Sequence, residues 1–328
     1  MATVPASKLY VVIAAINNRV HLERLLLSLV TPAERIPMRI VVVDNGSTDG
    51  TAEWLVKFGV GVQLISNEGN LGAAVAWNQG IRFALANMAN GCGAILVAGS
   101  DTLPMPGCVE RLWNNVINEG ILFTTGRQVP YDTPEAPCGP AATTEPMAES
   151  PDFSFFMFSP LVVRRLGEWD AAVELDRRIA WSKQHENVAP AEKPPLPIFQ
   201  TPWCYGLFDE RYATGYFEDN DLHTRMKHAG LLAVQDPGAV FRHDCSLTLR
   251  TNPEVAAKHT DQFRRNAELF RWKWGGLPHE VGLPQARPGN VTDDQWLKMS
   301  GGRPVTQVDR DAYRAQCTEV YTSYGLKL

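Results

Sequence analysis

The fold of this chain is decided by the stretch Val41-Val42-Val43-Asp44-Asn45-Gly46-Ser47-Thr48-Asp49-Gly50-Thr51. A β-branched run leads into an acid and a turn-forming segment, and Trp54, Leu55 and Phe58 follow at helical spacing. Strands covered on both faces of a parallel sheet read as such continuous apolar runs, and α/β proteins bind ligands where these strands end. The residue types after the strand fit a ligand loop and an ordinary helix cap equally well.

Other segments repeat this alternation of strand and helix. Further strands are predicted over Tyr10–Ala15, Val62–Ile65, Ala94–Ala98 and Ile121–Thr124, separated by helical apolar stripes. Strands alternating with helices indicate βαβ units, whose right-handed crossovers place the loops after the first four strands along one edge. We predict an α/β fold with a mostly parallel twisted sheet flanked by helices and a C-terminal helical extension.

The domain organisation follows from two interruptions. Pro-rich stretches over Gln128–Pro151 and Pro190–Pro202 are predicted to be surface excursions from one domain, because apolar segments resume after each. A helix is predicted from Asn252 to Gly275. We therefore expect a single domain over residues 1–276, with one half over 1–127 and another over 152–276. Residues 277–328 are expected to pack on it.

Composition narrows the class of protein. The 328 residues are 45% hydrophobic and 20% charged, with no run of 18 apolar residues and no secretion signal, so no membrane-spanning helix is expected. Six scattered cysteines without a CxxC pair favour reduced thiols and a cytoplasmic location, the host cytoplasm for a viral protein. The missing GxGxxG motif and P-loop lysine disfavour dinucleotide oxidoreductases and nucleoside triphosphatases. A net charge of −5 gives no global attraction for nucleic acid.

Short motifs follow the predicted strands in a fixed order. In the first half, residues 14–19 read AAINNR, residues 67–80 read NEGNLGAAVAWNQG and residues 99–102 read GSDT. In the second half, residues 207–212 read LFDERY, residues 216–226 read YFEDNDLHTRM and residues 236–243 read DPGAVFRH. Over roughly residues 8–276 their order and spacing resemble glycosyltransferase family 2. The resemblance implies a GT-A fold and transfer of a sugar from a nucleoside diphosphate donor, with inversion. It also makes residues 1–127 the nucleotide-binding half and residues 152–276 the acceptor and catalytic half.

The resemblance also implies a donor site at the strand ends. In the resembling family this acid, Asp44, binds the base and ribose of the donor. A carboxylate beside backbone amides can accept a hydrogen bond from the imide N–H of uracil, which favours a UDP-sugar. Glycines in the second motif allow the backbone to approach the donor sugar and diphosphate closely. The nucleotide-sugar residues expected on this basis are Ala15, Asn17, Arg19, Asp44, Asn70, Gly72, Asn78 and Ser100.

A divalent cation is expected beside this site. The family usually places an Asp-x-Asp pair at residues 99–101, and here Gly99 replaces the first acid while Asp101 remains. The resemblance makes Asp101 and His243 the two protein ligands of Mn²⁺ or Mg²⁺, and imidazole favours Mn²⁺. Without the resemblance, Asp101 also fits a turn former and His243 a structural hydrogen-bonding residue.

The segment Glu218-Asp219-Asn220-Asp221 opens a predicted helix. Acids suit any helix N-terminus, because the helix dipole stabilises negative charge there. The resemblance makes Asp219 the base that deprotonates the acceptor hydroxyl, while Glu218 positions the acceptor. Since a helix N-terminus lowers the pKa of a carboxyl group, we expect a weak base whose proton transfer runs late, with the cation stabilising the departing diphosphate.

The predicted function is a metal-dependent inverting hexosyltransferase acting on a hydroxyl of a polysaccharide or lipid-linked glycan. One alternative is a viral-type DNA glycosyltransferase that modifies hydroxymethylated pyrimidines, since residues 242–273 hold seven Lys/Arg against four Asp/Glu, with tryptophans nearby. A second is a non-catalytic nucleotide-sugar binding protein, because Gly99 replaces an acid. A third is a nucleotidyltransferase on a similar sheet. The sequence leaves the oligomeric state open.

Overall fold

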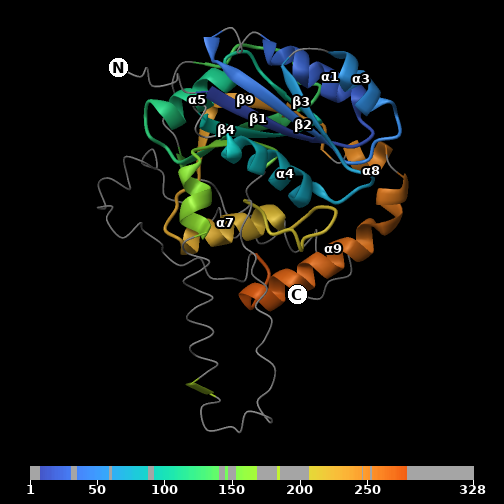
Figure 1. The fold of residues 1–328 in the computed structure, drawn as a ribbon. Helices are drawn as coiled ribbons and strands as arrows, with labels where there is room; N and C mark the ends of the chain where they lie inside the picture. Colours follow the sequence, from blue (N-terminus) through green and yellow to red (C-terminus); the bar gives the residue numbers. More distant parts are fainter. Residues whose placement is uncertain are drawn as a thin grey trace.

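A computed structural model describes residues 8–30, 35–58, 61–87, 92–139, 145–146, 153–167, 183–184, 207–245, 247–251 and 253–278. Within these ranges the strands form one nine-stranded sheet in the order β3-β2-β1-β4-β8-β6-β9-β5, with β7 beside β9 (Figure 1). The strands are β1 (Lys8–Ala15), β2 (Met38–Asp44), β3 (Val62–Ser66), β4 (Cys92–Gly99), β5 (Thr102–Pro104), β6 (Phe123–Pro130), β7 (Glu145–Pro146), β8 (Phe155–Phe158) and β9 (Val234–His243). The helices are α1 (Arg19–Ser28), α3 (Thr51–Phe58), α4 (Ala73–Ala86), α5 (Cys108–Ile117), α7 (Glu218–His228), α8 (Leu247–Thr251) and α9 (Pro253–Trp274). The expected packing of residues 279–328 lies outside the described residues.

The predicted α/β architecture is confirmed. Strand β1 pairs in parallel with β2 and β4, and β2 with β3, so the carboxyl ends of these four strands share one edge. Strand β8 runs antiparallel to both β4 and β6, while β5 and β7 run antiparallel to β9. No helix in the described ranges is long and apolar enough to cross a bilayer.

One predicted boundary was wrong. The strand expected to end at Thr124 continues to Pro130 as β6, into the stretch that was predicted to be a surface loop. After a bulge between Gly126 and Arg127, this extension pairs with residues 240–243 of β9. Such pairing joins segments more than 100 residues apart, and local residue patterns do not contain it.

The core lies on both faces of the sheet. On β1, Leu9, Val11 and Ile13 pack in one apolar layer with residues of α1 and α5, while Tyr10 and Val12 pack in the other with α4 and α7. Each of these five side chains is at most 1% exposed. Because both faces are covered, the strand is apolar at every position, as the sequence pattern indicated.

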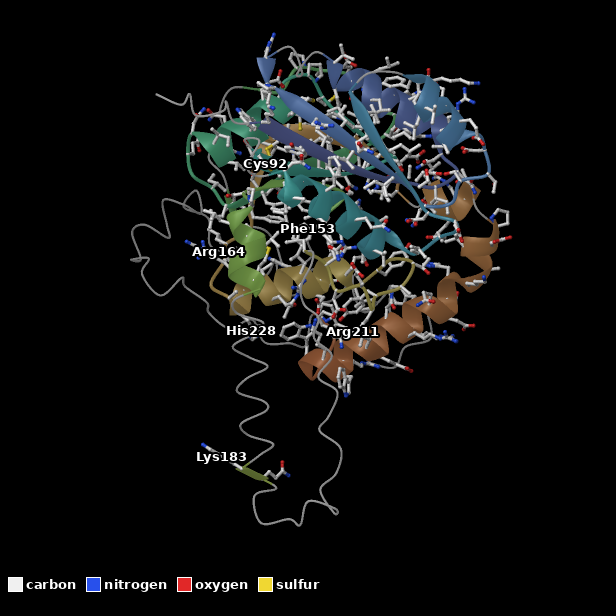
Figure 2. All side chains as sticks on the ribbon, in the orientation of Figure 1. Cys92, Phe153, Arg164, Lys183, Arg211 and His228 are labelled. Atoms are coloured by element: carbon white, nitrogen blue, oxygen red, sulfur yellow. The ribbon has the colours of Figure 1, made fainter. Side chains whose placement is uncertain are left out.

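A separate apolar cluster attaches α9 to the segment that precedes α7. Its buried residues are Tyr212, Phe217, Phe263, Ala267, Phe270 and Leu277. Its polar end is Lys273, whose Nζ lies 2.9 Å from Asp209 Oδ2 and 2.7 Å from Asp221 Oδ1 with the side chain 5% exposed. Burial alone would raise the pKa of Asp209, but Arg211 and Lys273 outweigh it and hold that pKa well below its ordinary value. Figure 2 shows Arg211 and His228 where α7 and α9 meet. The two helices are therefore joined by buried ion pairs as well as by apolar packing.

Candidate active site

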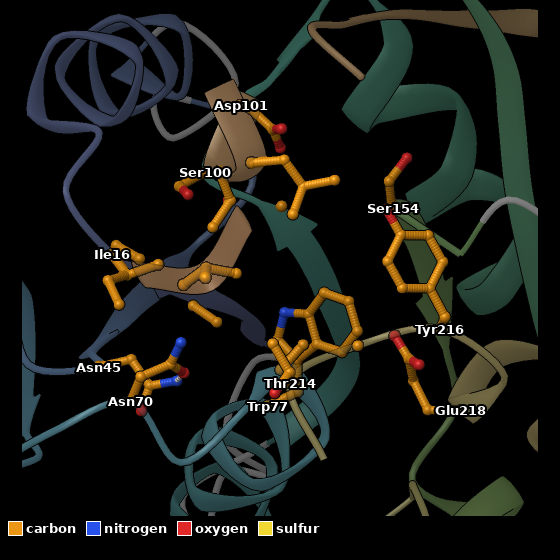
Figure 3. A pocket seen from close by; sticks show the side chains of 18 of the residues that line it. Ile16, Asn45, Asn70, Trp77, Ser100, Asp101, Ser154, Thr214, Tyr216 and Glu218 are labelled. Carbon is orange, nitrogen blue, oxygen red and sulfur yellow. Dashed lines mark hydrogen bonds between the residues drawn. The ribbon is translucent and has the colours of Figure 1, made fainter. Parts of the chain in front are cut away.

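A cavity of about 290 Å³ lies at the carboxyl edge of the parallel strands. Figure 3 shows Ile16, Asn45 and Asn70 on one side of it, Tyr216 and Glu218 on the opposite side, and Trp77 between them. Asp101, Asp219 and His243, which come from three distant parts of the chain, line the same cavity. Residues of α8 and α9 also line it, namely Thr248, Leu249, Val255 and His259.

Asp101 and His243 face each other across the β5–β9 pairing. Asp101 Oδ1 lies 3.5 Å from His243 Nε2, and the other ring nitrogen, Nδ1, lies 3.0 Å from Gln128 Oε1. The Gln128 amide is oriented by its Nε2, which donates to Cys245 Sγ at 3.2 Å. An amide oxygen only accepts, so Gln128 holds a ring proton on Nδ1 and leaves Nε2 as the nitrogen that faces Asp101. A metal-binding histidine is oriented in the same way, with one ring nitrogen hydrogen-bonded to a neighbour and the other directed at the ion.

The replacement of an acid by Gly99 has a structural counterpart. A Cβ atom built on Gly99 would lie 2.9 Å from Asp101 Oδ1, which is closer than real Cβ contacts come. The Asp101 carboxylate therefore occupies the space beside residue 99 that a side chain there would take. The observed position of the Asp101 carboxylate therefore depends on the absence of a side chain at residue 99.

Glu218 and Asp219 begin α7 at the cavity wall. Glu218 is 7% exposed, and its Oε2 is buried without a hydrogen-bond partner among the described residues. Burial, followed by the negative charge of Asp219, raises the pKa of Glu218 to about 8. Asp219 Oδ1 accepts a hydrogen bond from the backbone N–H of Asn220 at 2.7 Å. For Glu218, burial thus outweighs the helix dipole, which acts in the opposite direction at a helix N-terminus.

Three of the expected nucleotide-sugar residues, Ala15, Asn70 and Ser100, line the cavity. Asn70 Oδ1 accepts hydrogen bonds from Asn45 Nδ2 and from the backbone N–H of Gly72, both at 2.9 Å, which orders this loop. Ser100 Oγ accepts a hydrogen bond from the Asn18 amide. These contacts fix the side of the cavity that lies between β1, β4 and the loop before α4.

Asp44 lies next to the cavity wall rather than in it. It ends β2 in register with Ala15 and is 2% exposed. Burial raises its pKa, although hydrogen bonds from Ser47 act in the opposite direction. Gly72 also lies outside the wall, and its φ of 90° and the 2.6 Å between a built Cβ and Thr214 N show why glycine is needed there.

The other three expected residues hold loops in place. Asn17 Oδ1 accepts a hydrogen bond from Thr48 N at 2.7 Å, and the Arg19 guanidinium lies 5.8 Å from the centre of the Trp54 ring. Asn78 is 1% exposed, and its side chain binds the backbone of residues 207–208, accepting from both N–H groups at 2.8 and 3.0 Å. The structure therefore brings these residues to the scaffold around the cavity and not to its surface.

Several cavity residues were missed by sequence reasoning. Trp77 lines the cavity, and its Nε1 is buried without an acceptor among the described residues, although its helical spacing with Ala74 and Ile81 is typical of a core residue. Tyr216 and His259 also line the cavity. Trp77 follows a Gly-rich loop, Tyr216 precedes the Glu-Asp pair and His259 lies on α9. None of these positions marks a cavity residue in the sequence alone. A buried N–H donor in a cavity wall marks a place where a ligand can accept.

Comparisons with known proteins agree with this geometry. A family model described as Glycosyl transferase family 2 matches residues 10–160. The N-acetylglucosaminyl-diphospho-decaprenol L-rhamnosyltransferases of two Mycobacterium tuberculosis strains are each 29% identical over 276 residues, which cover 77% of this chain and 82% of the relative.

Similar solved structures were also found. The mannosyltransferase PcManGT from Pyrobaculum calidifontis, in complex with GDP-Man and Mn²⁺, aligns with a TM-score of 0.48 and 14% identity over 97% of this chain and 82% of that one. TarS residues 1–349 of S. aureus align with a TM-score of 0.45 and 14% identity over 89% and 78% of the two chains. Residues 10–160, which include the strands that end at the cavity, therefore belong to glycosyltransferase family 2, and the chain is a nucleotide-sugar glycosyltransferase.

Proposed function

We propose that the protein is an inverting, cation-dependent glycosyltransferase that moves a hexosyl group from UDP to a hydroxyl of a polysaccharide or lipid-linked glycan. The observation that carries this proposal is the convergence of Asp101, Asp219 and His243 on one cavity at the ends of β1 and β4. The lipid-linked acceptor is supported by the name of the Mycobacterium tuberculosis relatives.

The donor is expected at the strand end of the cavity. Ala15, Asn70 and Ser100 line this part, and Asp44 lies directly behind it at the end of β2. The buried Trp77 N–H points to an acceptor atom on the ligand, such as a sugar hydroxyl or a phosphate oxygen. Nucleotide-sugar donors carry many such oxygens.

Asp101 and His243 fit a divalent cation. Two ligands about 2.1 Å from one ion in neighbouring coordination positions are roughly 3 to 3.5 Å apart, and the observed separation of Asp101 Oδ1 and His243 Nε2 is 3.5 Å. No cluster of three or more His, Cys, Asp or Glu able to hold a metal occurs in the described ranges, so water and donor phosphates would complete the shell. When bound, Mn²⁺ or Mg²⁺ would neutralise charge on the departing diphosphate.

Asp219 is the proposed base. Its partner Glu218 holds a proton at neutral pH, which leaves Asp219 as the member of the pair that carries the negative charge. The acceptor oxygen loses its proton to Asp219 while it attacks the anomeric carbon from the face opposite the diphosphate. Glu218, as a neutral acid, donates a hydrogen bond that orients the acceptor.

The contacts of the basic C-terminal residues favour a glycan over DNA. Arg242 pairs with Glu135 and Arg250 with Asp244, while Lys273 is buried between two aspartates. These three cations neutralise acids of the chain itself, whereas Lys258, Arg264 and Arg265 on α9 are exposed. A duplex would meet a less basic surface than the sequence count indicates.

Release of nucleoside diphosphate tests the function directly. The chain is incubated with UDP-, GDP- and dTDP-sugars, with Mn²⁺ or with EDTA, in the presence of glycan, lipid-linked and hydroxymethylated DNA acceptors. We expect cation-dependent release of UDP and a product with the inverted anomeric configuration by NMR. Donor binding without release would indicate a binding protein, and pyrophosphate as product would indicate a nucleotidyltransferase.

The Asp219→Asn variant tests the base. It should bind the donor as the wild type does, because its side chain keeps its shape, while transfer falls by about two to four orders of magnitude. Unchanged turnover would reject the assignment of Asp219.

A further inference from the structure

The loop that leads into α7 has strained backbone. In the fully described segment 213–217, Thr214, Tyr216 and Phe217 have φ angles of 69°, 74° and 71°. These angles lie in the left-handed region, where a side chain crowds the neighbouring carbonyl, so bulky residues there cost free energy. Strain of this kind persists only where the surroundings hold it, and it is concentrated at functional sites.

Asn266 on α9 holds this loop from behind. Its side chain is 2% exposed, and its Nδ2 lies 3.0, 2.9 and 3.1 Å from the carbonyl oxygens of Ala213, Gly215 and Tyr216. Next to it, the Phe217 ring packs against Phe263 on α9 with the ring centres 5.1 Å apart. One buried amide therefore holds three carbonyls of the strained turn.

The consequence of this turn is the position of Tyr216. Its ring lines the cavity beside Glu218 (Figure 3) and stays 39% exposed, although it packs against His259 at 4.8 Å and Phe263 at 5.5 Å. A large aromatic ring that is exposed in a concave site next to carboxylates suits a pyranose. The C–H face of the sugar packs on the ring, and its hydroxyl groups reach the acids.

We propose that Tyr216 is the platform on which the ring of the acceptor sugar stacks, and that Asn266 is the positioning residue that keeps it there. This inference rests on the proposed transferase function. Tyr216 lies on the side of Glu218 and α9, opposite Asn45 and Asn70 at the donor end, which assigns the platform to the acceptor. The acceptor class is thus a glycan that presents a pyranose.

The test compares variants at residue 216 in the full chain. Tyr216→Gly and Tyr216→Asn remove the ring but suit the left-handed backbone, so both should fold. The donor is the nucleotide sugar that the wild type hydrolyses fastest, and the acceptors are p-nitrophenyl pyranosides. We expect the acceptor KM to rise about tenfold, with donor KM and hydrolysis by water changed less than about twofold. Tyr216→Phe should keep the wild-type acceptor KM within about threefold.

Asn266→Ala and a control on the same helix complete the test. Asn266→Ala should raise the acceptor KM as the Gly variant does, while Tyr216→Gly combined with Asn266→Ala should add little further. The control is Trp272→Ala, which removes a 65% exposed ring elsewhere on α9 and should leave the acceptor KM unchanged.

Two results would overturn the platform while leaving the transferase function standing. In the first, Tyr216→Gly has the same acceptor KM as the wild type and hydrolyses the donor normally. In the second, the wild type and Tyr216→Gly transfer sugar equally well to duplex DNA that contains hydroxymethyluracil. If the wild type turns over no donor at all, the proposed function fails. Saturation-transfer NMR with p-nitrophenyl N-acetylglucosaminide then decides the platform alone, because Tyr216→Gly should lose the signal and an unchanged signal would disprove it.

Discussion

The wild type should lose stability as the pH rises towards neutrality, and the Glu218→Gln variant should not. The stability of the variant relative to the wild type should therefore increase with pH. The folded protein keeps a proton on Glu218 up to a pKa of about 8, whereas the unfolded chain releases it near the ordinary value of 4.5. Between these values the folded state binds the extra proton, so wild-type stability is full below the unfolded pKa and falls with rising pH. The slope is about 1.4 kcal/mol per pH unit, or about 3 kcal/mol from pH 5.5 to pH 7.5.

Gln keeps the shape of the side chain and has no charge to bury, so this contribution disappears in the variant. The assay is urea unfolding followed by tryptophan fluorescence at pH 5.5, 6.5 and 7.5. The difference in unfolding free energy between variant and wild type should grow by about 3 kcal/mol over this range. Glu268→Gln, at an exposed acid on α9, is the matched control and should show a constant difference. A constant difference for Glu218→Gln as well would refute the reasoning that burial keeps Glu218 protonated.

Three further substitutions test other contacts. Gln128→Ala removes the acceptor that sets the ring tautomer of His243, and Mn²⁺ affinity measured by EPR titration should fall about 10- to 100-fold; an unchanged affinity would exclude this role. Gly99→Ala places a methyl group 2.9 Å from Asp101 Oδ1 and should weaken Mn²⁺ binding about tenfold, with the same titration as readout. Lys273→Met removes the cation that Asp209 and Asp221 share, while each acid keeps an arginine, Arg211 or Arg225; the unfolding free energy in urea should fall by about 1.5 to 3 kcal/mol, and an unchanged value would contradict the role of the buried lysine.

The donor half of the fold could be predicted from the sequence because its pattern is local. The apolar run before Asp44 and the run before Gly99 each predict a strand that is buried on both faces, and parallel pairing then brings their ends together. The mixed half could not be predicted in the same way. Pairing of β6 with β9 is set by contacts between segments more than 100 residues apart, and the residues at 127–130 resemble a loop when read alone.

The candidate site shows the same division. Residues that follow a strand or open a helix, such as Asp101 and Asp219, were placed at the cavity by motif and position. Trp77 and Tyr216 were missed because an aromatic in an apolar stripe reads as core, and its direction depends on the neighbouring loop. The raised pKa of Glu218 was missed for a similar reason, since burial is a property of the assembled fold and the helix dipole is a property of the segment.

The division of the cavity between separate chain segments has a consequence for how acceptor choice can diverge. Under the proposed function, the donor binds where β1, β4 and the loop before α4 line the cavity, whereas α8 and α9 contribute residues on the acceptor side. Substitutions of the α9 residues that line the cavity would then alter which acceptor sugar fits while the strands behind Asp101 stay the same. Related chains would in this way share one activated sugar and still serve different glycans, by varying a late stretch of about thirty residues that a buried lysine joins to the segment before α7.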